Sequence, residues 1–183
     1  MTTRDLTHIA LFAAVTAALG LLPPLMLPLL GVPITAQSMG PMLAGAVLGA
    51  RRGGLAMALF ILLVALGFPV LSGGRGGLGI LMGPGGGFLL AYPAAGYVVG
   101  LLCARAARPL RFFPALGGIL IGGIVLLYLA GIPWIAAVAG IGLSKAAVGS
   151  AWFLPGDLVK AVVAASIAVT VRRAVPLDEI SRA

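Results

Sequence analysis

Residues 153–160 read Phe-Leu-Pro-Gly-Asp-Leu-Val-Lys and place two charged side chains at the head of a long apolar run. The run that follows, 158–171, is nearly all Val, Ala, Ile and Leu. Proline early in a segment and an acid in the first turn are typical of a helix start. A spacing of three residues puts Asp157 and Lys160 on one face of that helix. Because ionisable side chains are costly inside a membrane, the pair predicts a ligand site. A salt bridge that only anchors the helix end is the alternative.

The composition of the 183-residue chain indicates its class. Hydrophobic residues make up 61% and charged residues only 9%, whereas charged residues are about a quarter of a typical soluble domain. We therefore predict one integral membrane domain covering residues 1–183. The net charge of +8 does not indicate nucleic-acid binding, because the basic residues fall between apolar segments, where they set membrane topology.

The arginines decide how many apolar segments cross the membrane. Six spans place Arg4, the pair at 51–52, the cluster at 105–111 and the pair at 172–173 on the cytoplasmic side, as the positive-inside rule prefers. A seventh crossing would export the C-terminal arginines. We predict an all-α bundle of six transmembrane helices with both termini in the cytoplasm. The first segment would also fit a cleaved signal peptide, but this topology requires it to be retained. The predicted spans are 6–22, 39–50, 53–67, 87–103, 112–129 and 155–171.

Segments outside the spans are predicted to lie at the outer face. Residues 67–88 hold too many glycines for a lipid-exposed helix, so we expect irregular backbone that lines a cavity, with Arg75 in its middle. Residues 131–151 are apolar, broken by glycines, and carry Lys145. We expect them to form a partly helical external loop that folds over the bundle before the sixth helix. The proline-broken segment that ends at Gln37 should be another outer loop, with this glutamine as its main polar group.

The predicted topology brings three charged features together near the outer face. They are Arg75 in the glycine-rich stretch, Lys145 in the loop, and Asp157 with Lys160 at the head of the last span. Arginine can hold a carboxylate in bidentate fashion and lysine as a point charge, whereas an aspartate accepts from N–H groups. The pattern predicts a cavity for a small ligand with a carboxylate, N–H donors and an apolar middle. For Lys145, snorkelling to water is the alternative.

Several classes of activity lack their characteristic residues in this sequence. There is no G-x-x-x-x-G-K-[ST] loop, so the chain is not expected to hydrolyse ATP. With a single histidine, and no second carboxylate at the depth of Asp157, acid/base pairs, a metal site and a Ser-His nucleophile are unsupported. The first hypothesis is a solute-binding transport subunit. The second is a small multi-span enzyme such as a lipid acyltransferase that holds phosphate with Arg and Lys, although no candidate base lies near those cations.

A stripe of small side chains follows the first predicted span. Ala10, Ala14 and Ala18 are four residues apart and lie on one helical face, which suits close contact with another helix. The sequence leaves open whether that helix belongs to this chain or to a partner.

Four motifs in order along the chain resemble the BioY family, the biotin-binding S components of energy-coupling-factor (ECF) vitamin transporters. They are V-P-I-T-A-Q at 32–37, A-G-A-V-L-G-A-R-R-G at 44–53, G-G-R-G-G-L-G-I-L-M-G-P-G-G-G-F at 73–88 and L-P-G-D-L-V-K at 154–160. The combination is specific, although no single motif is. At 83–88 the family pattern usually reads G-P-T-G-G-Y or F, whereas this chain has G-P-G-G-G-F and lacks the threonine hydroxyl.

The resemblance implies a non-enzymatic protein of the bacterial plasma membrane that takes biotin from outside and uses no cofactor. Asp157 and Lys160 fall on the family's P-G-D-x-x-K signature. The alanine stripe is similar to the surface through which such subunits dock onto the transmembrane coupling (T) subunit, and separate ATPase subunits would hydrolyse ATP. Lipids surround the chain, and a homo-oligomer is left open. The predicted substrate-binding residues are Asp157, Lys160, Arg75, Gly74, Gln37 and Lys145.

Overall fold

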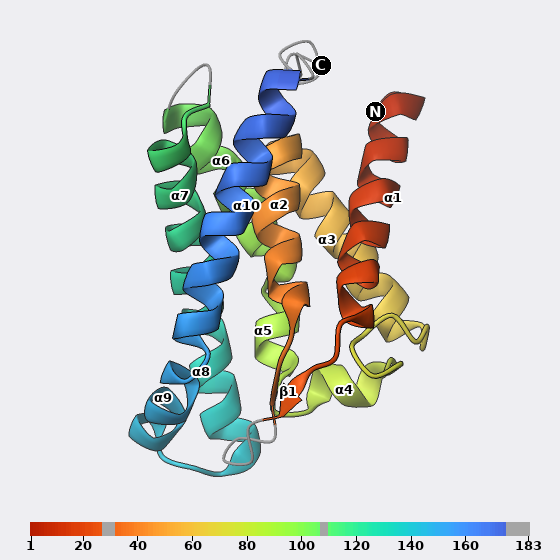
Figure 1. The fold of residues 1–183 in the computed structure, drawn as a ribbon. Helices are drawn as coiled ribbons and strands as arrows, with labels where there is room; N and C mark the ends of the chain where they lie inside the picture. Colours follow the sequence, from red (N-terminus) through yellow and green to blue (C-terminus); the bar gives the residue numbers. More distant parts are fainter. Residues whose placement is uncertain (27–31, 107–109, 175–183) are drawn as a thin grey trace.

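The computed structural model describes residues 1–26, 32–106 and 110–174, and these form a bundle of helices (Figure 1). The start of α1 and the end of α10 lie at the same end of the bundle, as an even number of crossings requires. An antiparallel pair of two-residue strands lies at the opposite end. In chain order the elements are α1 (Thr3–Ala18), η1 (Leu19–Leu21), β1 (Leu25–Met26), β2 (Pro33–Ile34), η2 (Ala36–Ser38), α2 (Met39–Leu48), α3 (Ala50–Ala65), α4 (Leu78–Met82), α5 (Gly86–Leu90), α6 (Tyr92–Ala106), α7 (Phe112–Leu120), η3 (Ile121–Val125), α8 (Leu126–Ala139), α9 (Leu143–Ala151) and α10 (Leu154–Ala174).

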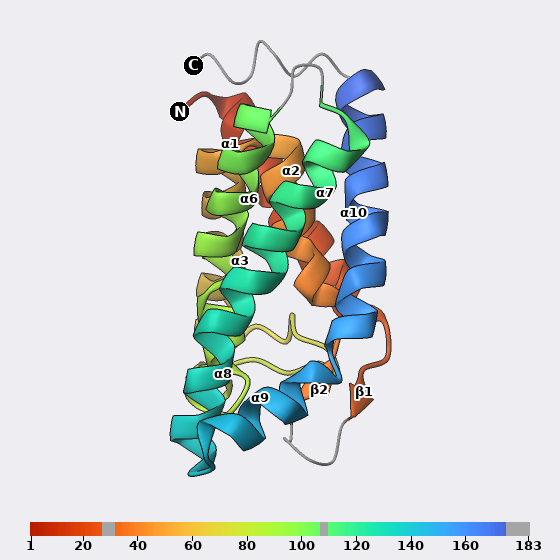
Figure 2. The same ribbon diagram turned by 90° about the vertical axis from the view of Figure 1, so that its left-hand side faces the viewer.

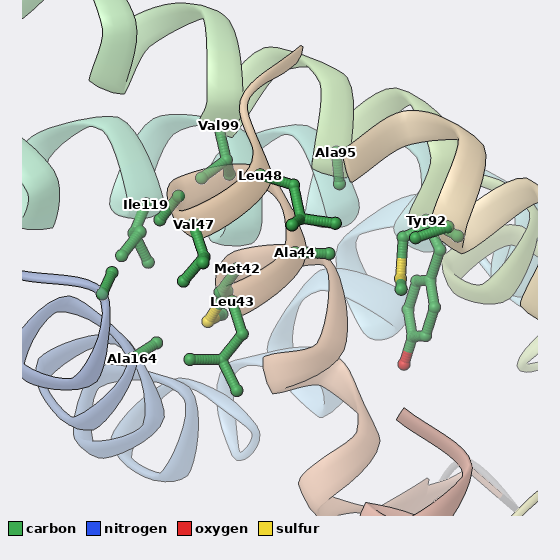
Figure 3. Close-up of a cluster of buried hydrophobic side chains, with 14 of the residues drawn as sticks. Met42, Leu43, Ala44, Val47, Leu48, Tyr92, Ala95, Val99, Ile119 and Ala164 are labelled. Atoms are coloured by element: carbon green, nitrogen blue, oxygen red, sulfur yellow. The ribbon is translucent and has the colours of Figure 1, made fainter. Parts of the chain in front are cut away.

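Helix α2 is the centre of the bundle. All residues from 40 to 48 are buried, and a helix that is apolar on every side needs neighbours all around it. Figure 3 shows α2 side chains such as Met42 and Val47 among residues of three other helices, with Val99 from α6, Ile119 from α7 and Ala164 from α10. The main hydrophobic core therefore surrounds a helix of only ten residues.

Glycines allow α2, α3 and α6 to pack with their backbones in contact. A Cβ atom at Gly45 would overlap the carbonyl oxygen of Gly96, and one at Gly100 would overlap the backbone of Ala50. Helix α2 ends at Gly49, whose φ of 85° is a conformation that residues with side chains rarely adopt. The second and third predicted spans are thus separate helices, as expected, with boundaries within three residues of those predicted.

The fifth predicted span is longer than the sequence indicated. Helices α7 and α8, joined by the π-helical turn η3, form one run of 28 residues, Phe112–Ala139, which crosses the whole view in Figure 2. The first part of the loop predicted at 131–151 is therefore part of this helix. Gly131 does not break the helix. It makes room for the ring of Phe88, which a Cβ atom would overlap. The helix ends at Gly140, where φ is 64°.

The second part of that predicted loop is helical as well. Helix α9 lies across the end of the bundle between α8 and α10 (Figure 2). Its buried residues are Ala146, Gly149 and Ser150. Residues 143–151 of the predicted loop are therefore a regular helix.

Among the residues that the structure describes, three helical runs are long and apolar enough to cross a membrane, namely Thr3–Leu21, Phe112–Ala139 and Leu154–Ala174. Helices α2, α3 and α6 also run along the bundle in Figure 1, but they have only 10, 16 and 15 residues. At 1.5 Å per residue, a ten-residue helix covers about 15 Å, roughly half of the hydrocarbon core. The short α2 is shielded on all sides by longer helices, so its length does not have to match the bilayer.

The glycine-rich stretch at 67–88 is partly ordered into short elements. It contains the five-residue helix α4 and the start of α5, which the expectation of irregular backbone did not include. Leu71 and Arg75 pair through two backbone hydrogen bonds. Gly73 and Gly74, with φ of 79° and 67°, make the turn between them. The stretch lies beside the β1–β2 pair, at the end opposite the start of α1 (Figure 1).

Candidate functional site

A cavity of about 230 Å³ lies among β2, the glycine-rich stretch, α8 and α10. This size is a little below the roughly 300–1,000 Å³ of typical ligand pockets, and it suits a small molecule better than a lipid or a peptide. The apolar side chains that line it include Val32, Ile34, Leu71, Phe88, Leu127 and Phe153. The polar and charged ones are Thr35, Gln37, Ser38, Arg75, Tyr92, Tyr128, Asp157 and Lys160.

Asp157 and Lys160 form an ion pair in the wall of this cavity, so the prediction that they share a face is confirmed. Lys160 Nζ lies 2.9 Å from Asp157 Oδ1, and the two side chains are only 16% and 11% exposed. Helix α10 buries Asp157 on the same stripe as Ala161 and Ala165, because these positions are one turn apart. The pair is therefore held between the bundle and the cavity, away from the lipid-facing side of α10.

Two residues from other helices complete the charged cluster. Ser38, directly before α2, accepts a hydrogen bond from Lys160 Nζ at 2.9 Å, and its hydroxyl lies 3.2 Å from Asp157 Oδ1. The hydroxyl of Tyr128, on α8, donates to Asp157 Oδ2 at 2.9 Å. An ionised carboxylate has about four lone-pair sites, two on each oxygen. Lys160 and Ser38 occupy those of Asp157 Oδ1, whereas Tyr128 occupies only one of those of Oδ2. Oδ2 can therefore still accept from a ligand N–H group while Lys160 compensates the negative charge.

An aromatic wall adjoins the charged cluster. Phe88, on α5, packs edge to face against Tyr128 and Phe153, with ring centroids 5.9 and 6.0 Å apart. Such arrangements add about 0.5–1.5 kcal/mol beyond the area that they bury. Trp134 Nε1 donates to Gly83 O at 2.9 Å and so ties α8 to the loop that borders the cavity. This wall supplies the apolar surface that the predicted ligand requires.

Arg75 lines the same cavity from the turn at 71–75. Its Nε donates to the carbonyl oxygen of Ser72 at 3.0 Å. Within the described ranges, the terminal guanidinium nitrogens of Arg75 make no hydrogen bond or ion pair. They are available to a ligand carboxylate, which arginine binds in bidentate fashion.

Gln37 also borders the cavity, but its amide is fully occupied by protein groups. The side chain is 2% exposed. Nε2 donates to Thr16 O at 3.1 Å and to Val70 O at 2.9 Å, and Oε1 accepts from the backbone N–H of Ser72 at 2.9 Å and from its hydroxyl at 3.3 Å. A glutamine amide has two N–H donors, and both are used here.

Two other predicted residues are not brought to the cavity. Gly74 is exposed and serves the turn, where its φ is 67°. Lys145 is exposed on α9 and does not line the cavity, because α9 turns Ala146 and Ser150 inward instead. The position of Lys145 fits the snorkelling alternative.

Sequence reasoning did not select Ser38, Tyr128 or Phe88, all of which line the cavity. Tyr128 was detectable in principle, because its hydroxyl stands out in the otherwise apolar run 112–129. Ser38 adjoins Gln37 at the start of an apolar helix. Phe88 has no distinguishing signal, since an aromatic residue in a membrane helix is usually a packing residue.

The exposed face of α1 is a candidate contact surface for another protein subunit. Ala10, Ala14 and Ala18 are all exposed on α1, so the alanine stripe is not covered by the described part of this chain. At the start of the same helix, Asp5 pairs with Arg52 of α3 at 2.7 Å and caps α1 through Thr2. Helix α1 is thus fixed to α3 on one side and leaves its small residues open on the other.

Comparison with known proteins finds one family over nearly the whole chain. The sequence profile of the BioY family matches residues 1–177. A biotin transporter BioY of Rhizobium etli is 52% identical over 185 aligned residues, which cover 97% of both chains. A probable biotin transporter BioY of Bacillus subtilis is 44% identical and covers 96% of this chain and 94% of its own.

A solved structure has the same fold. It is the S-component for biotin from an ECF-type ABC transporter, which superposes with a TM-score of 0.89 at 31% identity. The match covers 94% of this chain and 95% of the other. The relatives are named as transporters, and no comparison supports the lipid acyltransferase alternative.

Proposed function

This chain belongs to the BioY family, and we propose that it is the biotin-binding membrane subunit of an ECF-type transporter. It is a transport protein and not an enzyme, as its relatives are. The main support for biotin binding is the cavity, which combines the Asp157–Lys160 cluster, an aromatic wall and Arg75. Biotin offers a matching set of groups, namely ureido N–H donors, an apolar middle and a carboxylate.

The hydrogen bonds within the site suggest how its groups pair with the ligand. Lys160 Nζ is already bound to Asp157 and Ser38, whereas Arg75 keeps its terminal nitrogens available among the described residues. We therefore assign a ureido N–H group to Asp157 and the valerate carboxylate to Arg75, since a guanidinium binds a carboxylate through two parallel hydrogen bonds. The hydroxyl of Tyr128 donates to Oδ2 of the same carboxylate.

The transport role requires a topology and partners. We propose six membrane spans, formed by α1, α2, α3, α6, the α7–α8 run and α10, in the bacterial plasma membrane with both termini in the cytoplasm. The arginines at 51–52 and 172–173 support this orientation. The exposed stripe of Ala10, Ala14 and Ala18 would dock onto the transmembrane coupling subunit, and separate ATPase subunits would supply the energy.

The test is equilibrium binding of labelled biotin to the purified protein in nanodiscs, with Asp157→Asn and Lys160→Ala beside the wild type. Truncation of one partner of a buried charged contact costs about 2–5 kcal/mol, or more than tenfold in affinity. The control is Ser166→Ala, which removes a hydroxyl bonded only within its own helix. We expect the wild type and the control to bind biotin, and both variants to lose this binding. A folded, monodisperse wild type that binds no biotin would refute the proposal.

A further inference from the structure

Gln37 and Ser38 are consecutive residues, and each is connected by hydrogen bonds to one of the charged groups of the cavity. Ser38 contacts Asp157 and Lys160 directly, and Gln37 contacts Ser72, whose carbonyl oxygen holds Arg75. We propose that Gln37 is a positioning residue that fixes Arg75 for the ligand carboxylate, and not itself a ligand contact. This inference rests on the proposed function, because it concerns the same site.

The first argument is the saturation of the Gln37 amide. Both N–H groups are donated to backbone carbonyls, of Thr16 and Val70, and Oε1 accepts twice from Ser72. At 2% exposure, a ligand could recruit this amide only by breaking a buried hydrogen bond, which leaves an unsatisfied group at a cost of about 1–3 kcal/mol. The amide therefore serves the protein and not the ligand.

The second argument is the place where these bonds attach. Gln37 binds Val70 O and Ser72 N, the two backbone groups that flank Leu71 at the start of the Arg75 turn. The same Nε2 reaches Thr16 O in the last turn of α1. The side chain thus links the turn to a rigid helix and to the start of α2, and it does so with the short contacts of 2.9 to 3.1 Å.

In the described part of the chain, no side chain forms a hydrogen bond to the outer side of this turn. Gly73 and Gly74 are exposed, and a Cβ atom on Gly74 would meet nothing within 4 Å. Arg75 Nε donates to Ser72 O at 3.0 Å, so the orientation of the guanidinium follows the position of Ser72. Loss of the Gln37 amide would free Ser72 and spread Arg75 over more conformations, which weakens a bidentate contact that needs a fixed geometry.

This role has a signature that a purely structural role lacks. If Gln37 acts through Arg75, its loss must weaken a ligand that carries the carboxylate and spare one that does not. Biotinamide, in which a neutral amide replaces the carboxylate, provides that comparison. A general loosening of the bundle would weaken both ligands alike.

The experiment measures dissociation constants of biotin and biotinamide for the wild type, Gln37→Met, Arg75→Ala and the double variant in nanodiscs. Methionine keeps the length of the side chain and removes all four hydrogen bonds. Gln37→Met should lower biotin affinity on the order of tenfold and change biotinamide affinity by less than about twofold, the usual limit of additivity. In the Arg75→Ala background, it should have no further effect on biotin. Ser166→Ala again serves as the control.

The outcomes separate the inference from the proposed function. A wild type that binds neither ligand refutes the proposed function and the inference with it. Wild-type binding with equal losses of both ligands in Gln37→Met, or losses that add to those of Arg75→Ala, refutes the inference alone. Should Gln37→Met fail to fold, Gln37→Asn decides the matter. Asparagine retains the amide but is one methylene shorter. It should therefore lower the affinity by less, and again lower it more for biotin than for biotinamide.

Discussion

The ion pair between Asp157 and Lys160 should make these two residues strongly non-additive in the ligand-free protein. At the 2.9 Å distance between Nζ and Oδ1, and with an effective dielectric constant of about 20, their gross attraction is about 6 kcal/mol. Desolvation offsets much of this, because both side chains are more than four-fifths buried. Loss of one partner leaves the other buried without compensation, which costs about 3–5 kcal/mol, whereas loss of both is far milder.

The measurement is a double-mutant cycle of Asp157→Asn and Lys160→Met, followed by equilibrium unfolding in mixed micelles without biotin. With single losses of about 3–5 kcal/mol each and a far milder double loss, we expect a coupling free energy of at least about 3 kcal/mol, the upper end of the range for residues in one hydrogen-bonded network. A cycle of Asp5→Asn with Lys160→Met is the matched control, since Asp5 pairs with Arg52 at the other end of the bundle. That cycle should be additive. A coupling below about 0.5 kcal/mol between Asp157 and Lys160 would refute the reasoning.

Three further substitutions test other parts of the structure. Tyr128→Phe keeps the aromatic wall but removes the donor to Asp157 Oδ2. The dissociation constant for biotin should therefore rise about tenfold. Gly87→Ala places a methyl group against the side chain of Trp134, and this overpacking should lower the free energy of unfolding by about 1–3 kcal/mol. Ala14→Trp should abolish partner-dependent biotin uptake in cells and leave the dissociation constant of the purified protein unchanged.

Each of these three has a result that would contradict it. Unchanged affinity in Tyr128→Phe would show that its hydroxyl does not support the ligand-binding carboxylate. Gly117→Ala is the control for Gly87→Ala, because a Cβ atom there meets nothing within 4 Å. Equal destabilisation by both would contradict the packing argument. Normal uptake by Ala14→Trp would refute docking through the alanine stripe.

The spacing of charged residues was the most informative feature of the sequence. Asp157 and Lys160 are three residues apart on a helix, so their shared face followed from helix geometry alone, and the structure has them in contact. The positions of the arginines likewise indicated an even number of crossings, which fits the start of α1 and the end of α10 at the same end of the bundle (Figure 1). The shared face of Asp157 and Lys160 could be predicted because it depends on local periodicity alone, which acts without knowledge of the packing.

Other parts of the site depend on tertiary packing and could not be derived. Gly131 was predicted to begin an external loop, but it lies inside the helical run 112–139, where Phe88 fills the space that a Cβ atom would need. Tyr128 reaches Asp157 only because α8 continues the helix of α7. Gln37 was predicted to bind the substrate, but the hydrogen bonds of its amide go to partners that are 21, 33 and 35 residues away in sequence, which the sequence pattern does not show.

The π-helical turn η3 determines which way the side chains of α8, including Tyr128, point around the helix axis. Such a turn holds one residue more than an α-helical turn, so everything after it is rotated by about 100° relative to a regular helix. Gly122 and Gly123 seat the wide turn against Val99 and Met42. Deletion of one residue here would restore regular winding and swing Tyr128 away from Asp157, although no side chain of the site would have been altered. The turn thus sets the rotation of α8 about its axis separately from that of α7, so that α7 can face the core while Tyr128 on α8 faces the cavity.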